Sequence, residues 1–235
     1  MTLRITRVDG SASDETEVTG SLTLTLNTNQ IEDKEPAVLD FDLETIAAGF
    51  ADPDWVPQKI TCAAWSWVGS GKVESRICGP LGIYGKSELR REMLEPLLEE
   101  IAKADYVTGH NINRFDLPVL NAECMRLGLK PVQAVRTQDT IRLYRSKGFK
   151  KSQDNLGDLF GTADSKLHLN WQNWEDGYDE IGDNLKDLLD PSGDGLWSTI
   201  RSRAEIDVMQ HIQLREILLD RGIIMDPRMW YGKKH

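Results

Sequence analysis

Apolar and polar positions alternate in two segments near the N-terminus. LRITRV and SLTLTLN intersperse apolar and polar residues, close to a period of two, which is typical of half-exposed β-strands. The polar stretch DGSASDETEVTG separates the two segments and has the composition of a turn region. Residues 1–35 are therefore predicted to form a β-hairpin extension, whose role is either edge protection or contact with a partner.

From residue 36 onward, short apolar runs alternate with segments of helical period. The spacing of Leu89, Met93, Leu97 and Ile101 gives an apolar stripe on a predicted helix over residues 88–103, with Ser87 as its N-cap. Further helices are predicted over residues 115–127, 152–161 and 197–220. The predicted strands are VLDFDLE, KITCAAWSWVG, VESRICGPLGIY, ADYVTGHN and AVRTQDTIRLYR, the last of which runs into a helical turn. This order predicts an α/β domain over residues 36–235 with a five-stranded sheet flanked by helices.

Residues 161–198 break this pattern because they are polar and irregular. We interpret this segment as an insertion in the domain. Its tryptophans Trp171, Trp174 and Trp197 could either anchor a long loop or stack on bases.

Composition limits the class of protein. The chain has 235 residues and is 40% hydrophobic, which suffices for a core, and no apolar run reaches the roughly 20 residues of a membrane span. No apolar signal-peptide segment follows the N-terminus. Cys62, Cys78 and Cys124 stand in apolar surroundings and are predicted to be reduced thiols of a cytoplasmic protein. The net charge of −10 argues against a general nucleic-acid-binding protein.

Carboxylates in three segments are the candidate chemistry. Asp42 and Glu44 are two residues apart in a predicted buried strand, so their side chains share one face. Asp116 begins a predicted helix, and Asp207 lies within the last one. Buried carboxylates need compensation by positive charge, which hard divalent cations with oxygen ligands supply. Two such cations can clamp the attacking and leaving oxygens of a phosphodiester.

The segments FDLET, NINRFDLPVL and IDV, in that order, resemble the three motifs of the DEDD, or DnaQ-like, 3′→5′ exonuclease superfamily. The second segment is most similar to that of the proofreading domains of family-B DNA polymerases. The resemblance covers roughly residues 36 to 222 and implies a mixed, ribonuclease-H-like sheet. It implies a metal-dependent 3′→5′ exonuclease that hydrolyses phosphodiester bonds of single-stranded nucleic acid, with DNA favoured over RNA.

By this resemblance, Asp42, Glu44 and Asp207 would bind a first Mg²⁺ or Mn²⁺ ion, and Asp42 would bridge to a second. Asp116 would act through the shell of the second ion. Thr45, Asn111 and Phe115 would line the pocket of the terminal nucleotide, although Phe115 could equally be a core aromatic. Asp139 would have a supporting role rather than that of a metal ligand.

The chain departs from the family at the residue that positions or activates the attacking water. Most members carry a tyrosine four residues before the last aspartate or a histidine five before it, whereas this chain has Arg203 and Ser202. An arginine does not deprotonate, so it cannot act as a base. His211 and His168 are the candidates for a base from elsewhere, and His211 could equally be a half-buried structural histidine. His110 is expected to support the site.

This departure leaves two classes of function open. One is an active exonuclease, and the other is a catalytically degenerate module that binds nucleic acid or a protein partner. An endonuclease of the same fold is a third possibility, which the terminal-nucleotide residues disfavour.

A basic strip lies between the second and third motifs. It could track the phosphates of a single-stranded 3′ end without reading bases, or it could be a solvated loop. A replication or repair partner could bind the N-terminal extension, and no membrane contact is expected. The strip consists of Arg136, Arg142, Arg145, Lys147, Lys150 and Lys151.

Overall fold

The computed structural model describes residues 35–47, 58–84, 86–144, 150–162 and 196–232. The chain divides by its contacts into two units, Met1–Glu35 and Pro36–His235, and every element below belongs to the second. The predicted N-terminal hairpin and nearly all of the predicted insertion lie outside the described residues, so both stay predictions.

The sheet is mixed and has six strands in the order β3-β2-β1-β4-β5-β6. β1 pairs antiparallel with β2 and parallel with β4, and β5 continues the sheet parallel to β4. β3 pairs antiparallel with β2 at one edge, and β6 pairs antiparallel with β5 at the other. The strands are β1 (Val38–Ala47), β2 (Gln58–Trp67), β3 (Val73–Ile77), β4 (Tyr106–Gly109), β5 (Ala134–Asp139) and β6 (Arg228–Tyr231).

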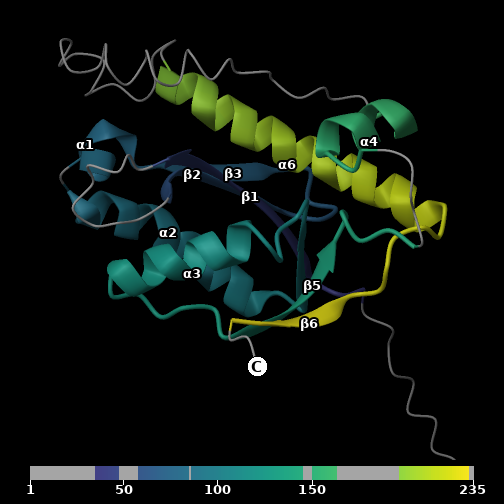
Figure 1. The fold of residues 1–235 in the computed structure, drawn as a ribbon, viewed down its shortest axis with the longest axis horizontal. Coiled ribbons are helices and arrows are strands. Elements are labelled where there is room, and N and C mark those ends of the chain that lie inside the picture. The colour runs from purple at the N-terminus through teal and green to yellow at the C-terminus, as the bar shows by residue number, and fades with distance from the viewer. Residues whose placement is uncertain (1–34, 48–57, 85, 145–149, 163–195, 233–235) are drawn as a thin grey trace, which may run out of the picture. The chain divides into compact units, whose positions relative to one another are not determined.

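Helices flank the sheet on both sides. Figure 1 shows α6 crossing one face of the sheet with α4 beside it, while α2 and α3 lie on the other side. Among the described residues, no helix combines the length and apolar character that crossing a membrane requires. The helices are α1 (Gly79–Tyr84), α2 (Ser87–Lys103), α3 (Asp116–Arg126), α4 (Gln153–Phe160) and α6 (Leu196–Asp220).

Three details differ from the sequence-based prediction. The third strand ends at Ile77, and the GPLGIY segment is α1, because Gly79 has a φ of 63° that interrupts the extended backbone. The N-cap of α2 is Lys86, with no side-chain cap bond, and Ser87 is already helical. β6 was not predicted, because a four-residue segment after Pro227 is too short to carry a readable period.

The two faces of β1 have opposite character. Leu39, Phe41 and Leu43 are buried in the main hydrophobic core, which includes residues of α2 and α3. Side chains alternate along a strand, so Asp40, Asp42 and Glu44 share the other face. That face meets α6, and β1 therefore presents a row of carboxylates to a helix.

Candidate metal centre

Three carboxylates converge where β1 meets α6. One oxygen from each of Asp42, Glu44 and Asp207 lies within 4.8 Å of the other two. Asp207 and Glu44 are buried, and Asp42 is half-buried. Side chains alternate along a strand, so Asp42 and Glu44 lie on one face of β1. α6 crosses that face and brings Asp207 to the same place. The three carboxylates are close enough to hold one metal ion between them.

Arg203 supplies part of the compensating charge. Its Nε lies 2.8 Å from Glu44 Oε1 and 3.8 Å from Asp207 Oδ2. One turn of helix separates Arg203 from Asp207, which brings both side chains to the same end of the cluster. Three carboxylates with oxygens this close together form a donor set that suits a divalent cation.

Asp116 adjoins this site but is not one of the three clustered carboxylates. It starts α3 and is 3% exposed, and its Oδ1 accepts a hydrogen bond of 3.2 Å from the backbone N–H of Leu43. The pKa of Asp116 is raised to about 7, mainly by burial. Hydrogen bonds from backbone N–H groups oppose this shift, and the negative charges of Asp139 and Glu44 add to it. Burial is therefore a larger cause of this shift than repulsion among the acids.

Asp139 holds the loop that leads to Asp116. Its Oδ1 accepts from the backbone N–H groups of Asn111, at 2.8 Å, and Ile141, at 3.2 Å. Its Oδ2 accepts from the N–H of Asn113, also at 3.2 Å. Asn111 has a φ of 65°, a conformation that asparagine tolerates better than most residues. These bonds agree with the supporting role expected for Asp139.

His211 lies on the same face of α6, two turns after Arg203, and it is 2% exposed. Its Nδ1 is hydrogen-bonded to the Asp40 carboxylate, and its Nε2 lies 2.8 Å from the hydroxyl oxygen of Thr140. The same hydroxyl lies 2.9 Å from His110 Nδ1. Both ring nitrogens of His211 are thus engaged in a buried chain, and this geometry favours a structural role over that of a base.

Asp40 was missed at the sequence level although a signal was present. It stands two residues before Asp42, so it continues the period that brought Asp42 and Glu44 together. Burial raises the pKa of its carboxyl, and the adjacent His211 lowers it in part.

Gln153 is a second residue that the sequence did not reveal. Its Nε2 donates to the backbone carbonyl of Asp207 at 2.8 Å and to Gln210 Oε1 at 3.1 Å. α4 is thereby fastened to α6 at the residue that supplies the third carboxylate. A glutamine on a predicted short helix has no local pattern that would indicate this contact.

The remaining predicted residues are spread around the cluster. Thr45 and Phe115 are half-buried, at the end of β1 and just before α3. Trp197 is 4% exposed and packs in the core. In the basic strip, Arg136, Arg142 and Lys150 are exposed and Lys151 is half-buried.

Other predicted residues lie outside the described part of the chain, namely His168, Trp171, Trp174, Arg145 and Lys147. The three cysteines are buried free thiols, as predicted.

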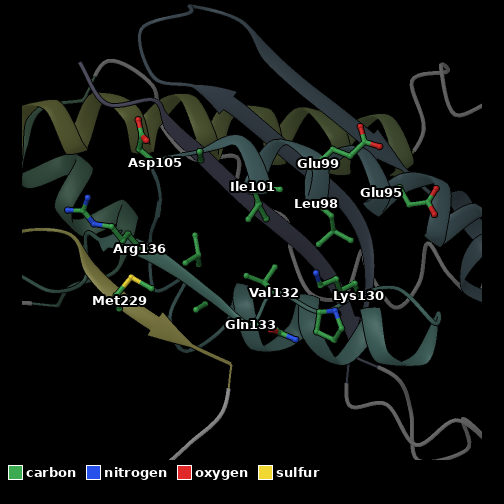
Figure 2. Close-up of a pocket in the computed structure, with 15 residues that line it drawn as sticks. Glu95, Leu98, Glu99, Ile101, Asp105, Lys130, Val132, Gln133, Arg136 and Met229 are labelled. Carbon is green, nitrogen blue, oxygen red and sulfur yellow. The ribbon is translucent and has the colours of Figure 1, made fainter. Parts of the chain in front are cut away.

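Two cavities are lined by residues other than the three carboxylates. Figure 2 shows one of about 740 Å³ between α2, the segment 130–133 and the edge of β5, with Glu95, Glu99 and Lys130 at its rim. The other, of about 700 Å³, is bounded by Asn113, Asp139 and β6.

Comparison with known proteins adds evidence about the fold. No protein-family model matches the chain, and no curated protein sequence matches it. Among solved structures, the chain is similar to the family B DNA polymerase from the hyperthermophilic archaeon Pyrobaculum calidifontis, with a TM-score of 0.53 and 18% sequence identity. The similarity covers 79% of this chain and 25% of the polymerase, so the chain spans about a quarter of that protein's length. At this identity the match concerns the fold alone, and it confirms the predicted ribonuclease-H-like α/β fold.

Proposed function

We propose that this protein is a metal-dependent 3′→5′ exonuclease that hydrolyses phosphodiester bonds of single-stranded nucleic acid, with DNA favoured. The observation that carries the proposal is the convergence of Asp42, Glu44 and Asp207 within 4.8 Å. These acids come from segments 163 residues apart (207 − 44), and they belong to the motifs that resemble exonucleases. The similarity of the fold to a DNA polymerase supports the same proposal.

The donor set fits Mg²⁺ or Mn²⁺. Asp42, Glu44 and Asp207 would hold the first ion, and Asp42 and Asp116 would hold the second. When bound, such ions lower the pKa of a water nucleophile and stabilise the leaving oxygen. The ion pair between Arg203 and Glu44 does not separate the three clustered acids, because one oxygen of each still lies within 4.8 Å of the others. A cation therefore fits among them.

Arg203 and Asp116 have distinct tasks in this proposal. The guanidinium of Arg203 neutralises Glu44 before substrate binds and then donates to a non-bridging phosphate oxygen. Asp116 stands on a rigid helix start, with its Oδ1 fixed by the backbone of β1, so its carboxylate is preorganised. Neither residue takes a proton from water as a tyrosine or a neutral histidine would.

The alternative is a degenerate module of the same fold that binds nucleic acid or a partner without cleaving it. The arginine at the position of the family's tyrosine favours this alternative, since its Nε is paired with Glu44 at 2.8 Å. Burying Glu44 and Asp207 beside a third carboxylate without a use is costly, which favours the enzyme.

A 5′-labelled single strand incubated with the protein and Mn²⁺ or Mg²⁺ tests the proposal. We expect a ladder that shortens from the 3′ end, and we expect Asp42→Asn to abolish it, because the bridging carboxylate becomes a neutral amide. Asp158→Asn, at an exposed position on α4, is the matched control and should cleave normally. Absence of a ladder with either ion would favour the binding module.

A further inference from the structure

The cavity beside β6 is lined by residues that suit the binding of nucleic acid. It occupies about 700 Å³, and Arg114, Arg142 and Lys151 contribute cationic side chains to its lining. Both arginines are exposed, and Lys151 is half-buried. Trp230 and Tyr231 of β6 add aromatic surface, and Tyr231 is 55% exposed.

Among the described residues that line the cavity, Asp139 is the one carboxylate, and it does not offset this positive charge at the surface. Asp139 is 4% exposed, and its oxygens accept hydrogen bonds from three backbone N–H groups. The cavity therefore presents cations and aromatic rings to a ligand. This combination suits a chain of phosphates and bases.

The cavity adjoins the candidate metal centre through one loop. Asn113 and Arg114 line the cavity, and Asp116 follows two residues after Arg114. Trp230 Nε1 donates to the backbone carbonyl of Asn113 at 3.1 Å, so β6 braces this loop from the cavity side. Asp139 lines the cavity and also lies close enough to Asp116 for its charge to act there.

We propose that this groove, defined as Arg114, Arg142, Lys151, Trp230 and Tyr231, binds the single-stranded nucleic acid upstream of the nucleotide held at the carboxylates. The proposal rests on the proposed function and extends it to β6, which carries no residue of the exonuclease-like motifs. The cations contact phosphates, and Tyr231 stacks on a base without reading its identity.

The test measures binding apart from cleavage. Fluorescence anisotropy of a labelled oligothymidylate is recorded in EDTA with an Asp42→Asn background. We expect Tyr231→Ala to weaken binding by about 5-fold or more, the lower range for loss of a stacking contact. Tyr231→Phe should bind like the parent. Arg114→Gln with Arg142→Gln should lower the salt slope by about 0.7 for each phosphate contact removed.

Lys72→Gln is the matched charge control. Lys72 lies in the turn between β2 and β3, at the opposite edge of the sheet from β6, and its ion pair with Glu74 is exposed. It should change neither affinity nor salt slope. Equal affinity of Tyr231→Ala and the parent, together with an unchanged salt slope in the arginine variants, would overturn the groove proposal and leave a protein ligand as the candidate occupant.

Hydrolysis of a small substrate distinguishes failure of the groove proposal from failure of the proposed function. A p-nitrophenyl ester of a nucleoside 5′-monophosphate can reach the carboxylates but is too short for the groove. In a wild-type background, the groove variants should hydrolyse it at the wild-type rate while their KM for a long strand rises. Loss of both activities would assign the groove residues to structure and overturn the proposal. If wild-type protein cleaves neither substrate but the groove variants still lose affinity, the groove stands and the exonuclease proposal fails.

Discussion

Arg203 is the residue whose chemistry departs most from that of the exonuclease family. Its Nε contacts Glu44 at 2.8 Å and approaches Asp207 at 3.8 Å. A guanidinium stays charged at all accessible pH values, so Arg203 competes with a metal ion for the same carboxylates. In the proposed reaction, Arg203 assists only after that ion pair opens toward a phosphate.

Replacing Arg203 should separate these two effects. We expect Arg203→Ala to bind Mn²⁺ more tightly in the absence of nucleic acid, because a competing cation is removed. Its cleavage rate should fall by on the order of 10²-fold, as for loss of one charge-stabilising donor, without reaching zero. Arg203→Tyr should retain more activity than Arg203→Ala, because a phenol can hydrogen-bond the attacking water. Calorimetric titration and single-turnover rates measure the two quantities.

Arg91→Ala, at an exposed position on α2, is the control for this experiment. An unchanged rate for Arg203→Ala, combined with complete loss of activity in His168→Ala, would place the base on that histidine and make Arg203 a bystander.

Asp116 should make metal-free protein less stable at higher pH. Its folded pKa is about 7, above the ordinary value of 3.8, so the folded state binds the proton more tightly than the unfolded state. The free energy of unfolding should therefore fall as pH rises from about 4 to about 7, by up to about 1.4 kcal/mol per pH unit. Urea unfolding in EDTA measures this slope. Asp116→Asn should remove its contribution, and an equal slope in both proteins would contradict the assignment.

At the scale of elements, β1 and α6 form one polar seam. Polar residues at a spacing of four on α6 face polar residues at a spacing of two on β1. At one end of this row of contacts, Arg215 donates hydrogen bonds to the Tyr106 hydroxyl and to Gln138 Oε1. Buried polar groups in such a seam are stable only when each is paired. On this seam Arg203 pairs with Glu44 and approaches Asp207, and His211 pairs with Asp40.

We expect Gln153 to be required to keep α6 in its position against β1. Gln153→Ala removes the bonds to the Asp207 carbonyl and to Gln210 Oε1, which should lower the free energy of unfolding by about 1–3 kcal/mol. Cleavage should also slow under conditions where the protein stays folded, because Asp207 loses its support. Urea unfolding and cleavage rates are the measurements.

Asp158→Ala, at an exposed position on the same helix, should change neither stability nor rate. A Gln153→Ala protein that is less stable but cleaves at the wild-type rate would show that α4 supports the fold and not the site.

At the scale of the whole molecule, metal binding should stabilise the fold. The chain carries a net charge of −10, and acids from β1, α3 and α6 gather at one place. A cation that binds only the folded state raises stability, by about 2.7 kcal/mol at a concentration 100 times its Kd. Mn²⁺ should therefore raise the Tm of the wild-type protein above its value in EDTA.

Asp207→Asn is the variant that checks this linkage. It should lose most of the Mn²⁺-dependent rise in Tm, and in EDTA it should be at least as stable as wild type, because repulsion among the carboxylates is reduced. Differential scanning calorimetry measures both effects. An equal Mn²⁺ shift in the variant would place the bound ion elsewhere.

The sequence by itself determined the order of elements from Val38 to Asp220, except for α1, and the shared face of Asp42 and Glu44. Both follow from local periods, which a chain expresses within a few residues. The sequence also singled out Asp207 and Arg203 as neighbours on one helix face, since a spacing of four suffices for that.

Only the tertiary structure decided which side chains meet across elements. The partners of His211, the clamp of Gln153 on Asp207 and the pairing of β6 with β5 join residues far apart in sequence, and no local period encodes them. The pKa of Asp116 belongs to the same class, because its main cause is burial under a packed helix start. Contacts of this kind depend on how α6, α4 and β6 pack around β1, which is a property of the folded chain and not of any one segment.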